Sequence, residues 1–307
     1  MKGINFITAR TKVLCIIGYP IEHSMSPIMH NAAIQDLNLN YIYLAFSIYP
    51  NNLELAVEAF RAFNIKGINV TIPFKQKIME YLDDIDTITQ KIGAINTIKN
   101  DKGYLTGRNT DAEGGKKAIL NAGYTILGKN ILLLGAGGAA RALSYILAND
   151  VNKIVIANRT EKRAEKLTNE LKKSFGINAE PKKFNNYVLR EEAKTADILI
   201  NTTPVGMYPN VDKSPIPAEF LHKDLIVFDV VYNPLETKLI KEATKKGCKT
   251  LGGLDMLVNQ GASAFEWWTN KKPNVNLMKK IIIEFLSKKE YEFFKNKNNK
   301  KNNKLLY

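Results

Sequence analysis

The chain has 307 residues, of which 45% are hydrophobic and 24% charged, and these fractions are ordinary for a globular protein. No stretch approaches the roughly 18 consecutive apolar residues of a membrane-spanning helix, and the first residues lack a sustained apolar run, so we expect neither a membrane span nor a secretory signal. Two cysteines exclude a disulfide framework and favour a cytoplasmic location, and the net charge of +14 raises the question of nucleic-acid binding.

The positive charge is spread along the chain. Residues 288–304 carry seven lysines against two glutamates, and much of the remaining positive charge falls in the expected helices 161–173 and 238–246. Dispersed charge of this kind is typical of solvated helix faces, so we do not expect a nucleic-acid partner. The end of the chain, almost only Asn and Lys over 295–304, predicts a basic, disordered tail over 287–307.

The first 112 residues alternate short apolar runs with helical patterns. Strands are expected at 13–17, 41–47, 67–70, 94–98 and 103–106, and helices from 27 onward and over 53–63 and 75–82. Ser26 precedes Pro27 and is a candidate N-cap of the first helix. This alternation predicts a mainly parallel sheet covered by helices, in a first domain over residues 1–112.

The alternation begins again after an expected connecting helix over 112–121. Further strands are expected at 130–134, 153–157, 197–201, 225–229 and 249–251, with helices over 138–147 and 160–174. These elements predict a second α/β domain over 113–253. Two more helices, 254–268 and 276–286, follow the last strand within a C-terminal segment over 254–286.

A glycine-rich turn joins the expected strand 130–134 to the expected helix 138–147. Gly135 permits a tight turn, Gly137 lets the backbone approach a pyrophosphate, and Ala140 stands where helix and strand pack closely. The free N–H groups at the helix N-terminus also favour phosphate. The strand–turn–helix context therefore predicts a dinucleotide site, with contacts from Gly135, Ala136, Gly137, Gly138 and Ala139.

The end of the next strand distinguishes between the two forms of nicotinamide cofactor. An NAD site places a carboxylate about 20 residues after the turn, where it binds the ribose 2′-hydroxyl. Here the corresponding residues are Asn158, Arg159 and Thr160, with Lys162 and Arg163 following. Because the arginine fork suits a 2′-phosphate, we expect NADP(H) rather than NAD. The alternative is that the arginines are solvated residues at the start of a helix.

Polar residues collect directly after apolar strands of the first domain. They occur in three segments, 18–27, 69–75 and the pair 93–97 with 107–111. Because ligands of open α/β sheets bind at the carboxyl ends of strands, these segments could face one pocket. Their hydroxyls, amides, one lysine and one carboxylate suit a small, hydroxylated acid. Lys75 is the best proton carrier of the set and Asp111 can orient it, although a surface ion pair is the alternative.

The sequence resembles the shikimate dehydrogenase family. The matching segments are residues 24–26, 69–75, 94–97, 109–111, 135–139, 158–160 and 260–262, and the resemblance extends over about residues 12–285. It implies reversible, NADP-dependent reduction of 3-dehydroshikimate to shikimate, a step toward chorismate and the aromatic amino acids. It also implies an N-terminal substrate domain, a Rossmann-type doubly wound NADP domain, and C-terminal helices that pack back on the first domain.

The resemblance further implies roles for individual residues. Lys75 and Asp111 correspond to the proton-transfer pair, and the hydroxyls of Ser24 and Ser26 to the groups that hold the substrate carboxylate. The remaining residues that it implies contact substrate are Thr71, Asn96, Tyr232 and Gln260, and it adds Val230 and Gly253 to the cofactor contacts. Capping of the first helix is the alternative for Ser26, and ordinary packing at a strand end is the alternative for Tyr232.

Two other functions remain open at this point. A quinate/shikimate dehydrogenase that uses NAD or NADP would have the same fold, and a ligand-sensing protein could retain the fold without turnover. The presence of both Lys75 and Asp111 disfavours a pure sensor. No His, Cys or carboxylate cluster has metal-ligand spacing, so we expect no metal. The expected partner is a small-molecule substrate, and the protein is expected to be a monomer or a homodimer.

Overall fold

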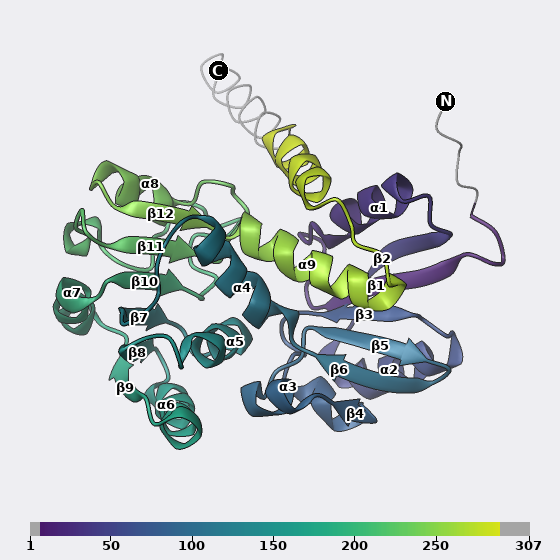
Figure 1. The fold of residues 1–307 in the computed structure, drawn as a ribbon, viewed down its shortest axis with the longest axis horizontal. Helices are drawn as coiled ribbons and strands as arrows, with labels where there is room; N and C mark the ends of the chain where they lie inside the picture. The colour runs from purple at the N-terminus through teal and green to yellow at the C-terminus, as the bar shows by residue number, and fades with distance from the viewer. Residues whose placement is uncertain (1–6, 289–307) are drawn as a thin grey trace, which may run out of the picture.

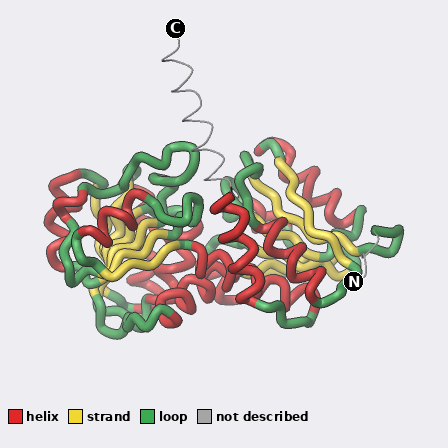
Figure 2. The backbone as a smooth tube through the Cα atoms, turned by 90° about the horizontal axis from the view of Figure 1, so that it is seen from above, coloured by secondary structure: helices red, strands yellow, loops and turns green. Residues whose placement is uncertain are grey.

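The computed structural model describes residues 7–288. Two six-stranded sheets lie in the two halves of the molecule, and helices lie between them (Figure 1). Seen from above, the strands form two separate groups with helices in the middle (Figure 2). Of the disordered tail expected over 287–307, residues 287 and 288 belong instead to a helix, and residues 289–307 lie outside the described residues. We use "first unit" for the sheet of β1–β6 with its helices and "second unit" for the sheet of β7–β12 with its helices.

The first sheet has the strand order β2-β1-β3-β5-β6-β4. Its strands are β1 (Lys12–Gly18), β2 (Tyr41–Ser47), β3 (Gly67–Val70), β4 (Asp84–Ile85), β5 (Thr97–Asp101) and β6 (Tyr104–Arg108). β1 is parallel to β2 and β3, and β4 is parallel to β6, whereas β5 is antiparallel to both of its neighbours. The helices of this unit are α1 (Ser26–Asp36), α2 (Leu53–Ala62) and α3 (Thr87–Ile92). The expectation of a mainly parallel sheet is confirmed.

The second sheet is parallel throughout, in the order β12-β11-β10-β7-β8-β9. Its strands are β7 (Asn130–Leu134), β8 (Lys153–Asn158), β9 (Asn178–Lys183), β10 (Ile198–Asn201), β11 (Ile226–Asp229) and β12 (Lys249–Gly252), and its helices are α5 (Gly138–Leu147), α6 (Glu161–Phe175), α7 (Asn186–Thr195) and α8 (Lys238–Lys245). The strand order reverses direction between β7 and β10, which is the doubly wound arrangement that binds nucleotides at this switch point.

Two helices cross the middle of the molecule, α4 (Thr110–Asn121) and α9 (Leu254–Thr269) (Figure 1). They approach closely because α4 has a glycine at the crossing: a β-carbon on Gly114 would lie only 2.8 Å from the backbone nitrogen of Gln260. The helix over 275–288 then packs beside α1, and its Met278, Ile282 and Leu286 join the core of the first unit. The expected return of the C-terminal helices to the first unit is confirmed.

Several sequence expectations need correction. The helix expected over 75–82 is only a 3₁₀ turn, Lys77–Tyr81, because the carbonyl of Lys75 accepts a hydrogen bond from Ile95 (2.7 Å) instead of from a following turn. The connecting helix begins at Thr110, since Asn109 caps it. The sequence predicted neither a helix at α3 or α7 nor a strand at β4 or β9, because these elements are short or polar. β9 contains a proline and lies at the edge of its sheet, where a missing N–H is tolerated.

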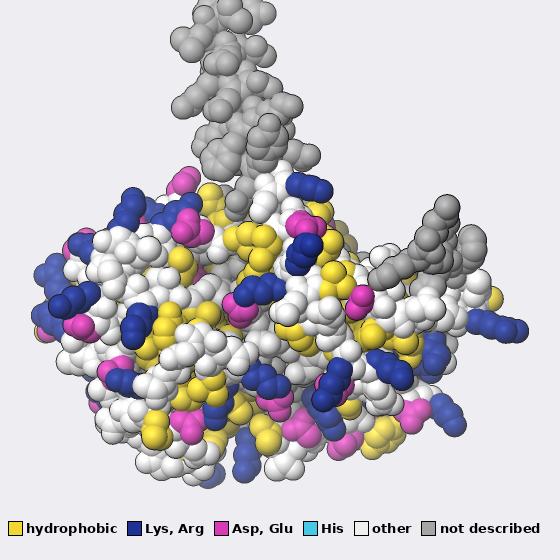
Figure 3. Space-filling model, turned by 45° about the horizontal axis from the view of Figure 1, so that its top comes forward, with side chains coloured by type: hydrophobic (Ala, Val, Ile, Leu, Met, Phe, Trp, Pro, Cys, Tyr) yellow, Lys and Arg dark blue, Asp and Glu magenta, His cyan; other side chains and the backbone are white. Residues whose placement is uncertain are grey.

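The surface is consistent with dispersed charge. On the face shown in Figure 3, Lys and Arg side chains lie over both halves of the molecule with Asp and Glu among them. Within residues 7–288, no helix is long and apolar enough to cross a membrane.

Cys15 and Cys248 are buried in different units with free thiols, and burial raises the pKa of both.

Candidate active site

Lys75 and Asp111 form an ion pair between the two sheets. The Nζ atom of Lys75 lies 2.5 Å from Oδ2 of Asp111, and the side chains are only 17% and 9% exposed. Lys75 follows the turn after β3, and its carbonyl is fixed by the backbone N–H of Ile95. Asp111 lies in the first turn of α4, where the helix dipole favours a carboxylate. The backbone of Lys75 is thus held by Ile95 and its ammonium group by Asp111, so two distant segments position this residue.

A buried amide holds the other oxygen of that carboxylate. Nδ2 of Asn96 lies within hydrogen-bonding distance of Asp111 Oδ1 (2.9 Å), Thr110 Oγ1 (2.9 Å) and Gln260 Oε1 (3.1 Å). Its Oδ1 accepts from the backbone N–H of Thr110 at 2.7 Å. We call Asn96, Thr110, Asp111 and Gln260 the Asn96 network. Because all four residues are buried, they fix the orientation of the carboxylate before any ligand binds.

Hydroxyl groups lie at the start of α1 and at the end of β3. Ser26 is the first residue of α1 and Met25 its N-cap, with no side-chain cap, so the expectation that Ser26 caps the helix is wrong. The Ser24 hydroxyl instead accepts from the backbone N–H of Ser26 (3.3 Å). Thr71 lies beside Gly18, where a β-carbon would be 2.6 Å from the Thr71 methyl group. The absence of a side chain at Gly18 therefore lets the end of β1 and the loop after β3 approach each other.

Three buried side chains, His30, Tyr43 and Asn69, form a layer that connects α1, β2 and β3. Tyr43 donates to Oδ1 of Asn69 (2.6 Å), and Asn69 donates to the carbonyl of Asn96 (3.1 Å). The His30 ring stacks on the Tyr43 ring with centroids 4.3 Å apart, and burial lowers the pKa of His30 to about 3. No local motif in the sequence predicts this layer, because its members come from α1, β2 and β3.

The glycine-rich turn has the geometry that a pyrophosphate requires. Gly135 has φ +106°, and a β-carbon there would lie 2.6 Å from the hydroxyl of Thr202, so glycine is needed on both grounds. A β-carbon on Gly137 would meet no atom within 4 Å, so this part of the turn faces open space. Ala136 and Ala139 are partly buried beside it. The turn fits a dinucleotide phosphate.

The same turn touches the lysine of the first unit. A β-carbon on Gly138 would lie 3.1 Å from Cδ of Lys75, so the lysine side chain runs along the start of α5. The proton carrier expected from the first half of the sequence and the phosphate turn expected from the second half are therefore neighbours.

The start of α6 carries the residues expected to bind a 2′-phosphate. Asn158 ends β8 and donates to the carbonyl of Thr160 (2.8 Å), which shapes the turn into the helix. Arg159, Lys162 and Arg163 are exposed, and within residues 7–288 none of the three makes an ion pair with a carboxylate. Since no carboxylate stands at the end of β8, the donors present fit a phosphorylated ribose.

The loops after β11 and β12 approach each other closely. A β-carbon on Gly253 would lie 2.1 Å from the carbonyl oxygen of Val230, so only glycine allows this contact. Tyr232 leaves the second unit and packs against the core of the first, and its hydroxyl bonds to the backbone of Met25. Burial raises the pKa of Tyr232 to about 12, so the hydroxyl is neutral near the start of α1.

A buried carboxylate organises the loop that leads to Val230. Asp229 is fully buried at the end of β11 and accepts from Asn201 (2.9 Å), Thr237 (2.6 Å) and the backbone of Val231 (3.1 Å). Burial raises the pKa of Asp229 to about 6, although these three donors act in the opposite direction. No sequence motif predicts this role for Asp229.

The structure brings the expected site residues into two groups. Lys75, Asp111, Asn96 and Gln260 form one connected network, with Ser24 and Ser26 at the start of α1 and Thr71 directly after β3. The expected cofactor residues lie at the carboxyl ends of β7, β8 and β11 and at the loop after β12. Among the described residues, no group of three His, Cys, Asp or Glu could hold a metal ion.

Three family models match the chain in consecutive segments. The shikimate dehydrogenase substrate binding domain matches residues 16–98, the shikimate / quinate 5-dehydrogenase model residues 117–228, and the shikimate 5′-dehydrogenase C-terminal domain residues 253–283.

Individual proteins agree with these matches. The chain is 50% identical to the shikimate dehydrogenase (NADP(+)) of Methanocaldococcus jannaschii, over 92% of this chain and 100% of that protein. The crystal structure of a shikimate dehydrogenase in complex with NADP+ superimposes with a TM-score of 0.85 at 47% identity, and covers 92% of this chain and 98% of its own. The shikimate 5-dehydrogenase of Listeria monocytogenes, in complex with shikimate and NAD, gives a TM-score of 0.82 at 41% identity, over 90% and 98%.

Proposed function

The chain belongs to the shikimate dehydrogenase family, and we propose that it catalyses the reversible, NADP-dependent reduction of 3-dehydroshikimate to shikimate. The observation that carries this proposal is the position of the Lys75–Asp111 pair against Gly138, at the start of the helix that receives the cofactor phosphates. A proton carrier and a dinucleotide turn at one place are what a nicotinamide-dependent alcohol dehydrogenase needs.

Lys75 moves the proton. In the reduction direction, its ammonium group donates a proton to the ketone oxygen as that oxygen becomes a hydroxyl, and the resulting amine regains a proton from solvent. In the oxidation direction, the amine accepts the proton of the hydroxyl. The bound cofactor supplies or accepts the hydride.

Asp111 orients the lysine and accepts a hydrogen bond from a substrate hydroxyl. Its Oδ2 holds Lys75, and Oδ1 accepts from Asn96, so the carboxylate cannot rotate away. Because Asn96 is itself held by Thr110 and Gln260, the ring hydroxyls meet acceptors and donors whose positions are fixed in advance.

The substrate carboxylate is assigned to Ser24 and Ser26. Both hydroxyls lie at the start of α1, and the Ser26 side chain is not consumed by helix capping. Neutral donors bind a carboxylate without placing a fixed positive charge near the reacting carbon. Thr71 and Tyr232 complete this side of the pocket, the latter from the second unit.

The cofactor is assigned to the turn at 135–139 and to the start of α6. Arg159, Lys162 and Arg163 provide cations for a 2′-phosphate, and Asn158 and Thr160 shape the turn that carries them. Val230 and Gly253 line the nicotinamide end through their backbones. These assignments favour NADP over NAD.

We assign residues 1–112 to substrate binding and catalysis, 113–253 to NADP binding, and 254–286 to the C-terminal helices that return to the first domain. The cytoplasmic location and the monomeric or homodimeric state stay predictions. Small-angle scattering with and without NADPH would test whether the two domains close by hinge motion near residues 108–113 and 252–255.

The decisive test is an absorbance assay of NADPH formation or NADH formation, with shikimate or quinate as substrate, in all four pairings. We expect the shikimate–NADP pair to have the highest kcat/KM. Higher kcat/KM for a quinate or NAD pairing would favour the quinate/shikimate alternative. Ligand binding without turnover in any pairing would indicate the sensor.

A further inference from the structure

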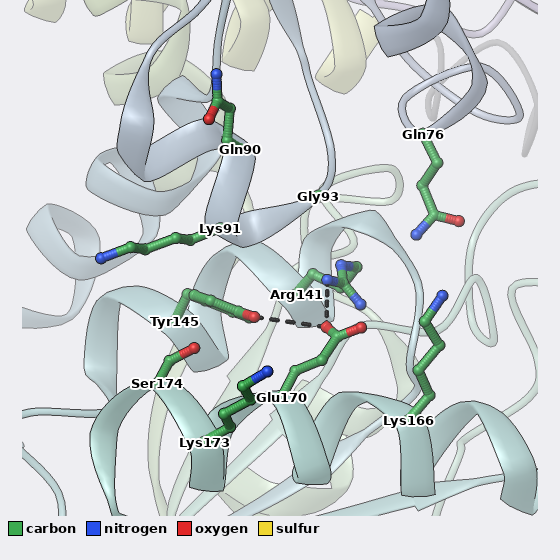
Figure 4. A pocket seen from close by; sticks show the side chains of 10 residues that line it. All are labelled: Gln76, Gln90, Lys91, Gly93, Arg141, Tyr145, Lys166, Glu170, Lys173 and Ser174. Carbon is green, nitrogen blue, oxygen red and sulfur yellow. Dashed lines mark hydrogen bonds and ion pairs between the residues drawn. The ribbon is translucent and has the colours of Figure 1, made fainter.

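A buried arginine joins the second unit to the first beside the candidate active site. Arg141 lies in the first turn of α5, and its side chain is 9% exposed. Its Nε donates to the backbone carbonyl of Ile92, and its Nη2 lies 2.5 Å from Oε2 of Glu170 on α6. Figure 4 shows the guanidinium between Gly93 and Glu170, with Tyr145 also bonded to that carboxylate (3.4 Å).

The partner of the arginine is a helix C-terminus. Ile92 is the last residue of α3, and its carbonyl carries part of the negative end of the helix dipole. Gly93 follows in the left-handed region, with φ +66°, and a β-carbon there would lie 2.8 Å from Nη2 of Arg141. Gly93 therefore both ends α3 and leaves room for the guanidinium.

The contact is connected to the proposed active site at both of its ends. On the first unit, Ile92 lies three residues before Ile95, whose backbone N–H holds the carbonyl of Lys75, and four before Asn96. On the second unit, the backbone N–H of Arg141 bonds to the carbonyl of Gly137 (2.9 Å), in the turn that Lys75 touches. One side chain thus links the cofactor turn to the segment that fixes Lys75 and Asn96.

This link lies at the edge of a large cavity. The cavity has a volume of about 680 Å³ and lies between α3, α5 and α6, with Gln76, Lys91 and Lys173 among its lining residues. The side chains of α3 and α6 therefore do not fill the space between them, and Arg141 provides the hydrogen bond that joins α5 to α3 across it.

We propose that Arg141 is a positioning residue, which sets the position of Lys75 relative to the cofactor turn by holding the C-terminus of α3. This inference rests on the proposed function, because it assigns a role in the alignment of the reaction. Arg141 contacts neither of the predicted ligand-binding groups through its guanidinium. Its loss should therefore lower the rate of the chemical step more than the affinity for either ligand.

The test compares Arg141→Lys and Arg141→Gln with the wild type and with Lys173→Gln, a control that lines the same cavity. We expect kcat to fall about tenfold to a hundredfold in both Arg141 variants, because small displacements of reacting groups cost rates of this order. The dissociation constants for NADPH and for shikimate, measured by fluorescence titration, should change less than about threefold. With deuterated NADPH, the isotope effect on kcat should not fall below the wild-type value.

Three results would overturn the inference. They are a kcat within about twofold of the wild type in both variants, a rise in the NADPH dissociation constant in proportion to the loss of kcat, and an equal loss in the Lys173→Gln control. Arg141→Lys retains the charge and serves if Arg141→Gln does not fold, as judged by thermal melting. An inactive wild type would instead contradict the proposed function, so the two failures are distinguishable.

Discussion

The two sides of the candidate site differ in how their polar groups are paired. On the side of the first unit, Lys75, Asp111, Asn96 and Gln260 are bonded to one another and mostly buried. At the 2′-phosphate side of the second unit, Arg159, Lys162 and Arg163 are exposed. The first side therefore has the geometry proposed for catalysis before any substrate arrives, whereas the exposed cations of the second side are free to bind the charge of the proposed ligand.

This difference has a physical reason. A proton-transfer group must be held within a fraction of an ångström of its target, so the protein supplies its partners internally. A phosphate is recognised by charge and by several donors, and an internal carboxylate partner would compete with it.

Replacement of Lys75 by alanine should have the largest effect. It removes the proposed proton carrier, and general acid–base groups typically contribute about 10²–10⁴-fold to the rate. We expect kcat to fall by that factor, as measured by steady-state kinetics with shikimate and NADP. Lys77→Ala is the matched control, because Lys77 is exposed and forms its ion pair with Glu80 on the same turn. A folded Lys75→Ala protein with full activity would refute the assignment.

Asp229 should make the second unit sensitive to pH. Its folded-state pKa of about 6 lies above the ordinary value of 3.8, so its stabilising contribution is full below about pH 4 and is lost as the pH rises through 6. The loss should amount to roughly 3 kcal/mol of unfolding free energy. Urea titrations between pH 4 and 7 should show it in the wild type and not in Asp229→Asn. Parallel pH curves for the two proteins would contradict this expectation.

Replacement of Arg159 by alanine should affect only the phosphorylated cofactor. A hydrogen bond to a charged group is worth about 1.5–3 kcal/mol, so KM for NADPH should rise about tenfold to a hundredfold. KM for NADH should stay within about twofold, because that cofactor lacks the 2′-phosphate. Lys172→Ala, near the other end of α6, provides the control. Equal losses with both cofactors would mean that Arg159 does not bind the phosphate.

Gln260→Ala should give the smallest change. It removes one acceptor of the Asn96 network and leaves two others in place. A single buried hydrogen bond contributes about 1 kcal/mol, so KM for shikimate should rise about fivefold with little change in KM for NADPH. The opposite result, a selective loss of NADPH affinity, would mean that Gln260 acts on the cofactor side of the site and not on the substrate side.

The sequence predicted much of this arrangement where a local pattern carries the information. The turn at 135–140 is identifiable because its glycines, the preceding strand and the following helix are contiguous. The start of α4 could also have been placed from sequence, since Asn109 is a good N-cap and Asp111 an expected first-turn acid. The helix expected over 75–82 was wrong because the bond from Ile95 to Lys75 is a contact between distant segments.

Other parts of the fold and of the site depend entirely on contacts between segments that are distant in the sequence. Nothing around Tyr43 in the sequence indicates that it bonds to Asn69, and Arg141 reads as an ordinary residue of an amphipathic helix until α3 is placed beside it. The same applies to Asp229, whose donors include the side chain of Asn201 on β10, 28 residues earlier in the chain. Local patterns can propose which residues act, and the packing of distant segments determines what holds them.

The core of the first unit also has a consequence for biosynthesis. Part of that core combines residues near Leu14 and Met29 with Phe265 and Met278, which are separated in sequence by the whole second unit. A nascent chain that has emerged from the ribosome as far as β12 contains all six strands of the second sheet. The first unit of this nascent chain still lacks α9 and the helix over 275–288, which contribute to its core. The core of the half that is translated first can therefore be completed only after the second sheet has been synthesised.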